Sequence, residues 1–274
     1  MQLHFNYIFT FLEDFFTICQ NIFIQSNMNS GYIAVIDSGI GGISVLKSLI
    51  KELPNEHYLY FGDNFNAPYG NKSKSQLRLL TFNNLQYLKQ FPIKALVVAC
   101  GTLSTTLLND IRQFSELPTF GVYPPVESAL AHGEKTLLLS TRLTAKQYVE
   151  NQLLTVVGLR GLASEIEYKA SDLSKVDFCN NILTCEDYER IKNKRFDTVI
   201  LGCTHYFFVK NQIFDHFRPQ KIISGDHFTV KMVKKYLQKV KSLVKYKRFQ
   251  VDFIGDSAKF NQEFFIKSGQ YGQK

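Results

Sequence analysis

Residues 93–108 read IKALVVACGTLSTTLL, an apolar run that ends on Cys100 and continues into small hydroxyl side chains. Residues 196–209 read FDTVILGCTHYFFV and repeat this pattern, with Cys203 at the end of the run. Short continuous apolar runs are typical of strands that are buried on both faces. Each segment therefore predicts a buried strand that ends on a thiol and leads into a helix.

Strands and helices are predicted to alternate along the rest of the chain. The expected strands are 32–37, 57–63, 95–100, 119–123, 135–141, 165–170, 197–203 and 221–225. The expected helices are 41–53, 74–91, 104–115, 126–133, 144–157, 186–193 and 208–217. Strands separated by helices indicate an α/β fold with mostly parallel sheets covered on both faces, and in such sheets the chemistry gathers beyond the carboxyl ends of the strands.

The length and composition suit two domains. A chain of 274 residues with 45% hydrophobic content is long enough for two domains of about 120 residues. We assign residues 28–125 to a first half that contributes Cys100 and residues 126–230 to a second half that contributes Cys203. Residues 231–274 are expected to form a basic helix and a return segment that packs on the first half. Because no flexible linker separates the halves, we expect them to face each other across one cleft.

The first 27 residues differ in character from the rest. They are rich in Phe and Ile but carry Glu13 and Asp14 inside the apolar run. No Lys or Arg precedes the run and no small-residue cleavage site follows it, which argues against a signal peptide, and the two acids leave no run long enough to span a bilayer. We expect either that Met28 is the natural start or that residues 1–27 form an appended amphipathic helix.

The formal charge of +8 is concentrated near the C-terminus. Eight Lys or Arg and no acid lie between Lys231 and Arg248, while apolar residues recur at helical spacing from Val230 to Val244. The cations are therefore expected on the solvated face of an amphipathic helix. Nucleic-acid binding through this face is the less favoured interpretation.

The five cysteines indicate a reducing, cytoplasmic setting, because the number is odd and the spacing is not that of a secreted disulfide framework. Cys179 and Cys185 have no second pair at zinc-binding distance in the sequence, so no metal site is predicted.

Two loops after predicted strands carry candidate binding groups. Residues 37–45, DSGIGGISV, have Ser44 where a dinucleotide-binding loop requires its third glycine. The N–H groups of this loop suit a carboxylate instead, with Asp37 and Ser38 beside them. Residues 67–70, APYG, form a stiff turn that is expected to bring backbone N–H groups and the Tyr69 phenol toward the cleft.

The two cysteines at strand ends are the strongest candidates for chemistry. A single buried Cys is usually a small core residue, but both thiols here lead into predicted helices and are followed by Thr102 and Thr204. Thiolates form near neutral pH beside helix N-termini or cations. His205, two residues after Cys203, is a candidate proton partner.

Five segments together resemble the signature of glutamate racemases, in the aspartate/glutamate racemase superfamily. They are IDSGIGGISVL at 36–46, FGDNFNAPYGNKS at 61–73, VVACGT at 97–102, LGCTHY at 201–206 and VDFIGDSAKF at 251–260. The resemblance runs from about residue 31 to about residue 269. It implies two pseudo-symmetric α/β domains with the active site in the cleft between them, without pyridoxal phosphate, another cofactor or a metal.

The resemblance also implies roles for individual residues. Cys100 and Cys203 would lie on opposite faces of the substrate Cα, one as thiolate base and the other as thiol acid, assisted by Asp37 and His205 respectively. The residues that would hold the substrate are Asp37, Ser38, Pro68, Tyr69, Gly70, Gly101, Thr102, Thr204 and His205. The activity expected is cofactor-independent racemisation of L-glutamate to D-glutamate for peptidoglycan and cell-wall synthesis, by a cytoplasmic protein that forms a homodimer.

The sequence departs from the family pattern at several sites. Gly101 replaces an Asn, Leu103 replaces a small residue and could narrow the pocket, and YPP at 123–125 replaces an EPG-like stretch. A carboxylate usual in the second half has no clear counterpart, and Asp177 is the candidate. These departures keep two alternatives open: a related racemase or isomerase for another small amino acid or dicarboxylate, and a weakened paralogue that binds an amino acid.

Overall fold

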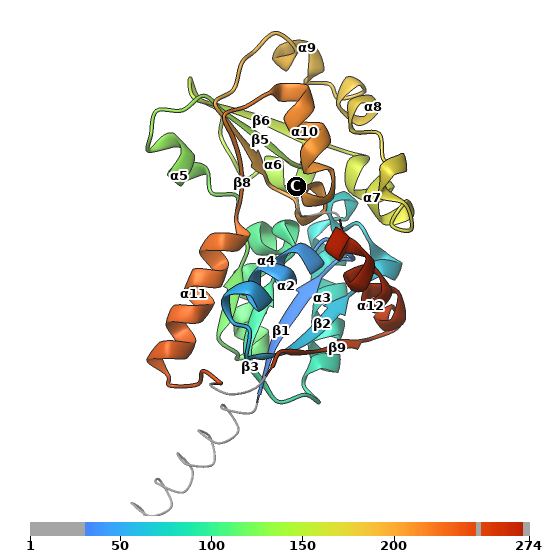
Figure 1. The fold of residues 1–274 in the computed structure, drawn as a ribbon, viewed down its shortest axis with the longest axis vertical. Coiled ribbons are helices and arrows are strands. Elements are labelled where there is room, and N and C mark those ends of the chain that lie inside the picture. Colours follow the sequence, from blue (N-terminus) through green and yellow to red (C-terminus); the bar gives the residue numbers. More distant parts are fainter. Residues whose placement is uncertain (1–30, 245–247, 271–274) are drawn as a thin grey trace, which may run out of the picture.

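The computed structural model describes residues 31–244 and 248–270, and shows two parallel sheets, each flanked by helices (Figure 1). The first sheet has the order β4-β3-β1-β2-β9 and the second has the order β6-β5-β7-β8, with every neighbouring pair parallel. The predicted α/β class is confirmed. Residues 1–27, with both hypotheses about them, lie outside the described residues.

The strands and helices have the following bounds. The strands are β1 Tyr32–Asp37, β2 His57–Gly62, β3 Ile93–Val98, β4 Thr119–Gly121, β5 Thr136–Thr141, β6 Leu154–Leu159, β7 Thr198–Leu201, β8 Lys221–Ser224 and β9 Gln250–Ile254. The α-helices are α2 Ile43–Glu52, α3 Lys74–Leu88, α4 Gly101–Ser115, α5 Val126–Leu130, α6 Arg142–Ala145, α7 Leu162–Tyr168, α8 Phe178–Leu183, α9 Tyr188–Ile191, α10 Lys210–Phe217, α11 Asp226–Lys239 and α12 Ala258–Lys267. The 3₁₀ helices are η1 Asn64–Asn66, η2 Tyr69–Asn71, η3 Leu173–Lys175, η4 Thr204–Val209 and η5 Ser268–Gln270.

The chain passes between the two halves twice, from β4 to α5 and from β8 to α11 (Figure 1). After the second passage α11 returns to the first half, where Thr229 Oγ1 donates a hydrogen bond to the Gly121 carbonyl. The chain then adds β9 to the free side of β2 in parallel register. The first half is therefore built from both ends of the described chain. It contains the elements up to β4 together with α11, β9 and the helix α12 that follows β9.

Strand register brings the two cysteines to the inner edges of the sheets. Ile36 of β1 pairs with Val98 of β3, so Asp37, the last residue of β1, and Cys100, which follows β3, lie at the same edge of the sheet. In the second sheet Leu139 of β5 pairs with Leu201 of β7, so Thr141 lies near the strand end that carries Cys203. Parallel strands deliver their carboxyl ends to one side, which is why residues far apart in sequence meet at the seam between the halves.

Two predicted elements in the second half are wrong. The helix expected over 144–157 is the short α6 followed by strand β6, whose sequence LTVVGL is rich in residues that favour strands. The strand expected over 165–170 is helix α7, whose buried residues Leu162, Ala163 and Ile166 follow helical spacing. Short apolar runs are ambiguous between buried strand and buried helix, which explains both errors.

The basic helix is shorter than predicted. In α11, Val230, Val233 and Leu237 are buried while Lys231, Lys235 and Lys239 are exposed, as expected for an amphipathic helix. The helix does not continue to Val244. Lys241 adopts a left-handed backbone conformation with φ of 54°, and the Val244 N–H donates to the Glu56 carboxylate. Within the described residues, no helix is long and apolar enough to cross a membrane.

Candidate active site

Cys100 and Cys203 both lie buried at the seam between the two halves. Cys100 immediately precedes α4 and Cys203 immediately precedes η4, and their exposed fractions are 5% and 9%. Burial is the main cause that raises the pKa of the Cys100 thiol, and the neighbouring Cys203 sulfur raises it further. The structure therefore brings both thiols to one site, from opposite sides of the seam.

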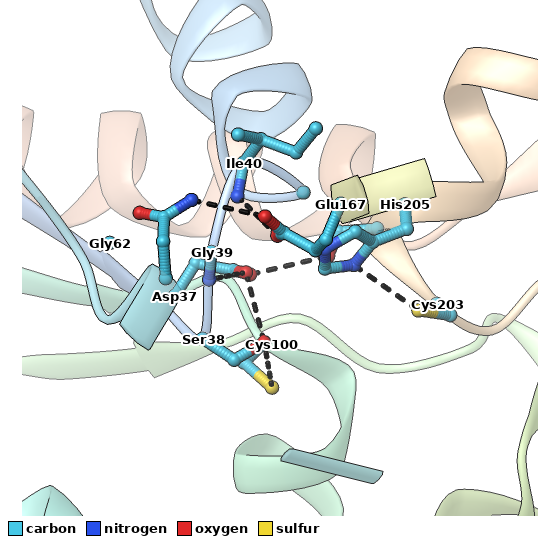
Figure 2. A network of polar contacts seen from close by, with 12 residues as sticks. Asp37, Ser38, Gly39, Ile40, Gly62, Cys100, Glu167, Cys203 and His205 are labelled. Atoms are coloured by element: carbon cyan, nitrogen blue, oxygen red, sulfur yellow. Dashed lines mark hydrogen bonds and ion pairs between the residues drawn. The ribbon is translucent and has the colours of Figure 1, made fainter. Parts of the chain in front are cut away.

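Ser38 links Cys100 to Asp37 on the side of the first half (Figure 2). The Cys100 thiol points to Ser38 Oγ at 4.0 Å, and Ser38 Oγ in turn donates to Asp37 Oδ1 at 3.4 Å. Burial raises the pKa of Asp37 to about 6, although His205 and the Gly39 N–H pull it back down. A carboxyl group of this kind can gain and lose a proton near neutral pH, as a proton relay requires.

Burial also raises the pKa of the Cys100 thiol, and the nearby Asp37 carboxylate raises it further. Cys100 is therefore held in its protonated form while the site has this geometry. Such a thiol can act as an acid but needs help from Asp37 to act as a base.

The side of the second half has the opposite electrostatic character. His205 Nδ1 lies 3.6 Å from the Cys203 sulfur, and His205 Nε2 lies 2.6 Å from Glu167 Oε1 (Figure 2). Burial by itself would lower the pKa of His205, but the hydrogen bonds to Cys203 and Glu167 raise it well above its usual value. An imidazolium beside a sulfur stabilises the thiolate. The site thus places a protonated thiol on one side and a sulfur beside a cationic imidazole on the other.

Glu167 is a site residue that the sequence analysis missed. It lies on α7, and it accepts a hydrogen bond from the Ile40 N–H of the first half at 2.7 Å while it holds His205. Asp177, the carboxylate expected in this role, is exposed and caps α8 by accepting from the Asn180 N–H. Glu167 was missed because residues 165–170 were predicted to form a strand and not part of helix α7. A strand there gives no reason to expect the Glu167 side chain at the seam.

The predicted substrate-binding residues in the loop after β2 take two different positions. The Tyr69 phenol is buried and donates to Asp63 at 2.6 Å, and Tyr69 packs in the same apolar cluster as Cys100. Gly70 lies against Thr141 of the other half, and a Cβ on Gly70 would come within 2.6 Å of the Thr141 side chain. Pro68 is half-buried at the start of this turn, just before η2.

The predicted residues that follow the cysteines contact the opposite half. Thr102 Oγ1 lies 3.1 Å from Thr141 Oγ1, and Thr204 Oγ1 donates to Asp37 at 3.2 Å. A Cβ on Gly101 would lie 2.8 Å from the Gly202 carbonyl oxygen. Leu103 is buried in the core of the first half with Leu107, which accounts for its size without any narrowing of the pocket.

The cavity beside Cys203 has a volume of only about 20 Å³, which is room for about one water molecule. Gly101, Tyr123 and Pro124 line it, so part of the unusual YPP stretch borders the site. An amino acid is larger than this cavity, so the site must widen to admit one. Among the described residues, no group of three or more His, Cys, Asp or Glu side chains could hold a metal ion.

The two buried thiols lie where the two parallel sheets face each other, and comparison with known families gives the class of protein. Residues 33–233 match the model of the Asp/Glu/Hydantoin racemase family, and the chain belongs to this family.

Similar proteins narrow the class to glutamate racemases. The glutamate racemase of Clostridium acetobutylicum is 37% identical over 220 residues, which are 76% of this chain and 84% of the relative. The structure of a glutamate racemase from Bacillus anthracis matches with a TM-score of 0.69 at 26% identity, over 89% of this chain and 95% of the other. A glutamate racemase from Francisella tularensis in complex with D-glutamate matches with a TM-score of 0.68 at 25% identity, over 87% and 94%.

Proposed function

We propose that this protein interconverts L-glutamate and D-glutamate by moving one proton at Cα between its two faces. The observation that carries the proposal is the pair of buried thiols in different protonation settings, Cys100 beside Asp37 and Cys203 beside His205. The substrate follows from the relatives, since the similar protein of Clostridium acetobutylicum is a glutamate racemase.

The chemistry needs no net change in protons. The Cys203 thiolate takes the α-proton, so a C–H bond breaks, an S–H bond forms, and the electron pair left on Cα spreads into the α-carboxylate. The Cys100 thiol then gives its proton to the opposite face of Cα, which inverts the stereocentre and leaves a thiolate on Cys100. For the other enantiomer the roles reverse, with Asp37 now assisting Cys100 as base.

Several of the groups that would bind the substrate also join the halves, since Thr102 meets Thr141 and Thr204 meets Asp37. The loop N–H groups beside Asp37, with Ser38, Pro68, Gly70, Gly101, Thr102 and Thr204, would contact the carboxylates and the ammonium group of the substrate. Tyr69 would act by holding this loop through Asp63. Donors fixed before the reaction stabilise charge that develops on the α-carboxylate at no cost of reorganisation.

In the cell, the D-glutamate would serve peptidoglycan synthesis. The cysteines of the described region, Cys100, Cys179, Cys185 and Cys203, are all free, which suits work in the reducing cytoplasm. By resemblance to the family, the protein would act as a homodimer and without a cofactor.

The test is proton exchange in heavy water. Purified protein incubated with L-glutamate in heavy water should exchange the α-proton and yield D-glutamate, measured by NMR and chiral chromatography. Cys100→Ser and Cys203→Ser should each abolish turnover. Binding without exchange would identify the weakened amino-acid-binding paralogue, and exchange of another amino acid in place of glutamate would identify the related racemase. Full activity in either Ser variant would overturn the two-thiol mechanism.

A further inference from the structure

Glu167 is held by both halves of the molecule at once. Its Oε1 atom meets His205 Nε2 at 2.6 Å and the Ile40 N–H at 2.7 Å, and its Oε2 atom accepts from Asn64 Nδ2 at 3.1 Å. Asn64 and Ile40 belong to the first half, whereas Glu167 and His205 belong to the second. The orientation of this carboxylate therefore depends on the halves being together.

Asn64 is itself oriented by a residue of the C-terminal helix. Asn261 of α12 is fully buried, and its Nδ2 atom donates to Asn64 Oδ1 at 2.8 Å. With its oxygen occupied in this way, the Asn64 amide must turn its nitrogen toward Glu167. The reverse orientation would place the amide oxygen against a carboxylate, so Asn261 determines which atom faces Glu167.

Gly62 leaves the space in which the two amides meet. A Cβ on Gly62 would come within 2.8 Å of Asn261 Nδ2 and 3.0 Å of Asn64 Oδ1. The Asn261 Oδ1 atom is buried without a hydrogen-bond partner among the described residues. A buried unpaired amide oxygen is costly, so burial of Asn261 is partly offset by this cost, and its hydrogen bond to Asn64 is the contact that its amide makes at 2.8 Å.

We propose that Asn64, oriented by Asn261, is a positioning residue that couples closure of the two halves to the proton-transfer state of His205. The inference rests on the proposed racemase function. On closure, the Asn64 N–H fixes Glu167 in line with His205, and His205 then stays cationic beside Cys203. When the halves separate, Glu167 loses both first-half donors and the His205–Glu167 contact loosens.

The sign of the effect follows from the groups that face His205. These groups are Glu167 from α7, Cys203 ahead of η4 and Asp37 from the end of β1. Asn64 is neutral, so its loss changes no charge and acts only through the geometry of Glu167. A looser Glu167 contact lowers the pKa of His205, since that contact is one of the two that raise it. The basic limb of activity then moves to lower pH.

The experiment compares Asn64→Leu, Asn261→Leu and the double variant in the full chain. Both single variants should lower kcat about tenfold, the effect of one lost hydrogen bond to a charged group, with KM little changed. The double variant should be no slower than Asn64→Leu, because Asn261 acts through Asn64. NMR titration of labelled His205, assigned with His205→Gln, should show its pKa lowered in Asn64→Leu. This titration needs no turnover, so it separates failure of the inference from failure of the proposed function.

Asn181→Leu is the matched control, since Asn181 donates a hydrogen bond to Glu165, two residues before Glu167 on the same helix, but away from His205. It should change neither kcat nor the titration. If Asn64→Leu leaves the His205 titration unchanged, if the two Asn effects simply add, or if Asn181→Leu produces the same shift, the coupling is refuted. Asn64 is only half-buried, so Asn64→Leu decides the matter even if Asn261→Leu fails to fold.

Discussion

Gly101 lies against the main chain of the other half, at a distance that a side chain would not allow. A Cβ there would be 2.8 Å from the Gly202 carbonyl oxygen. Gly202 cannot easily move away, because its N–H donates to the Leu139 carbonyl at 2.7 Å. A side chain at position 101 would therefore have to displace the main chain of the other half.

Replacing Gly101 should therefore impair the enzyme, even when the new residue is the family's Asn. We expect Gly101→Asn and Gly101→Ala to lower kcat/KM by a factor on the order of tenfold or more, since small displacements of reacting groups are costly. Steady-state kinetics on both variants would measure it. Gly269→Ala is the control, because a Cβ at Gly269 meets nothing within 4 Å. A faster Gly101→Asn enzyme would contradict this view and show that the site is a weakened version of the family's.

Asp37 should set the acid limb of activity. Its carboxyl group must be ionised to receive a proton from Cys100, and its pKa is raised to about 6 by burial. In the direction of racemisation in which Cys100 is the base, activity should then rise as pH increases through about 6 and level off above it. A pH profile of kcat/KM would show this limb, and Asp37→Asn should lower the rate strongly and remove it. An unchanged limb in the Asp37→Asn variant would assign it to another group.

At the scale of elements, a buried ion pair fastens the segment between α11 and β9 to the first sheet. Lys94 of β3 and Glu56 are both almost fully buried and lie 2.6 Å apart. The same two side chains bind the backbone of the segment, with Lys94 donating to the Ser242 carbonyl and Glu56 accepting from the Val244 N–H. The pair thereby positions the chain for the pairing of β9 with β2.

Breaking this pair on one side should destabilise the protein strongly. Glu56→Gln leaves the Lys94 ammonium buried without a counter-charge, for which we expect a loss of about 3 to 5 kcal/mol in the free energy of unfolding. Urea unfolding would measure the change. Lys234→Gln removes the exposed Lys234–Glu52 pair instead and should cost at most about 1 kcal/mol. Equal losses in the two variants would show that burial of the Lys94–Glu56 pair is unimportant.

The sequence predicted elements well where the hydrophobic pattern was long or bounded by distinctive loops. The strands that lead to Asp37, Cys100 and Cys203 were foreseen, because each is a short apolar run followed by small or polar residues. In the span 144–170 the hydrophobic pattern was ambiguous. A helix was predicted where the chain forms β6, and a strand was predicted where it forms α7. Glu167 was lost with α7, and the links from Asn64 and Asn261 depend on long-range packing that no local pattern reveals.

At the scale of the whole molecule, the two halves are joined across the seam by contacts between candidate site residues. Thr102 meets Thr141, Thr204 meets Asp37 and Glu167 meets Ile40. These contacts leave room for only about one water beside Cys203. The groups proposed to bind the substrate therefore also hold the two halves together, and we expect the substrate to compete with these contacts as it enters.

Locking the halves together should then stop turnover without touching either of the thiols proposed to be catalytic. The Oγ1 atoms of Thr102 and Thr141 are 3.1 Å apart, and a disulfide needs about 2.05 Å between sulfurs, so Thr102→Cys with Thr141→Cys can form one after a small adjustment. The oxidised double variant should lose nearly all activity, and reduction should restore the activity of the reduced variant. Peptide mapping would verify that residues 102 and 141 are bridged while Cys100 and Cys203 stay free. Each single variant controls for loss of a Thr hydroxyl. Full activity in the bridged form would mean that glutamate reaches the thiols without separation of the halves at this point.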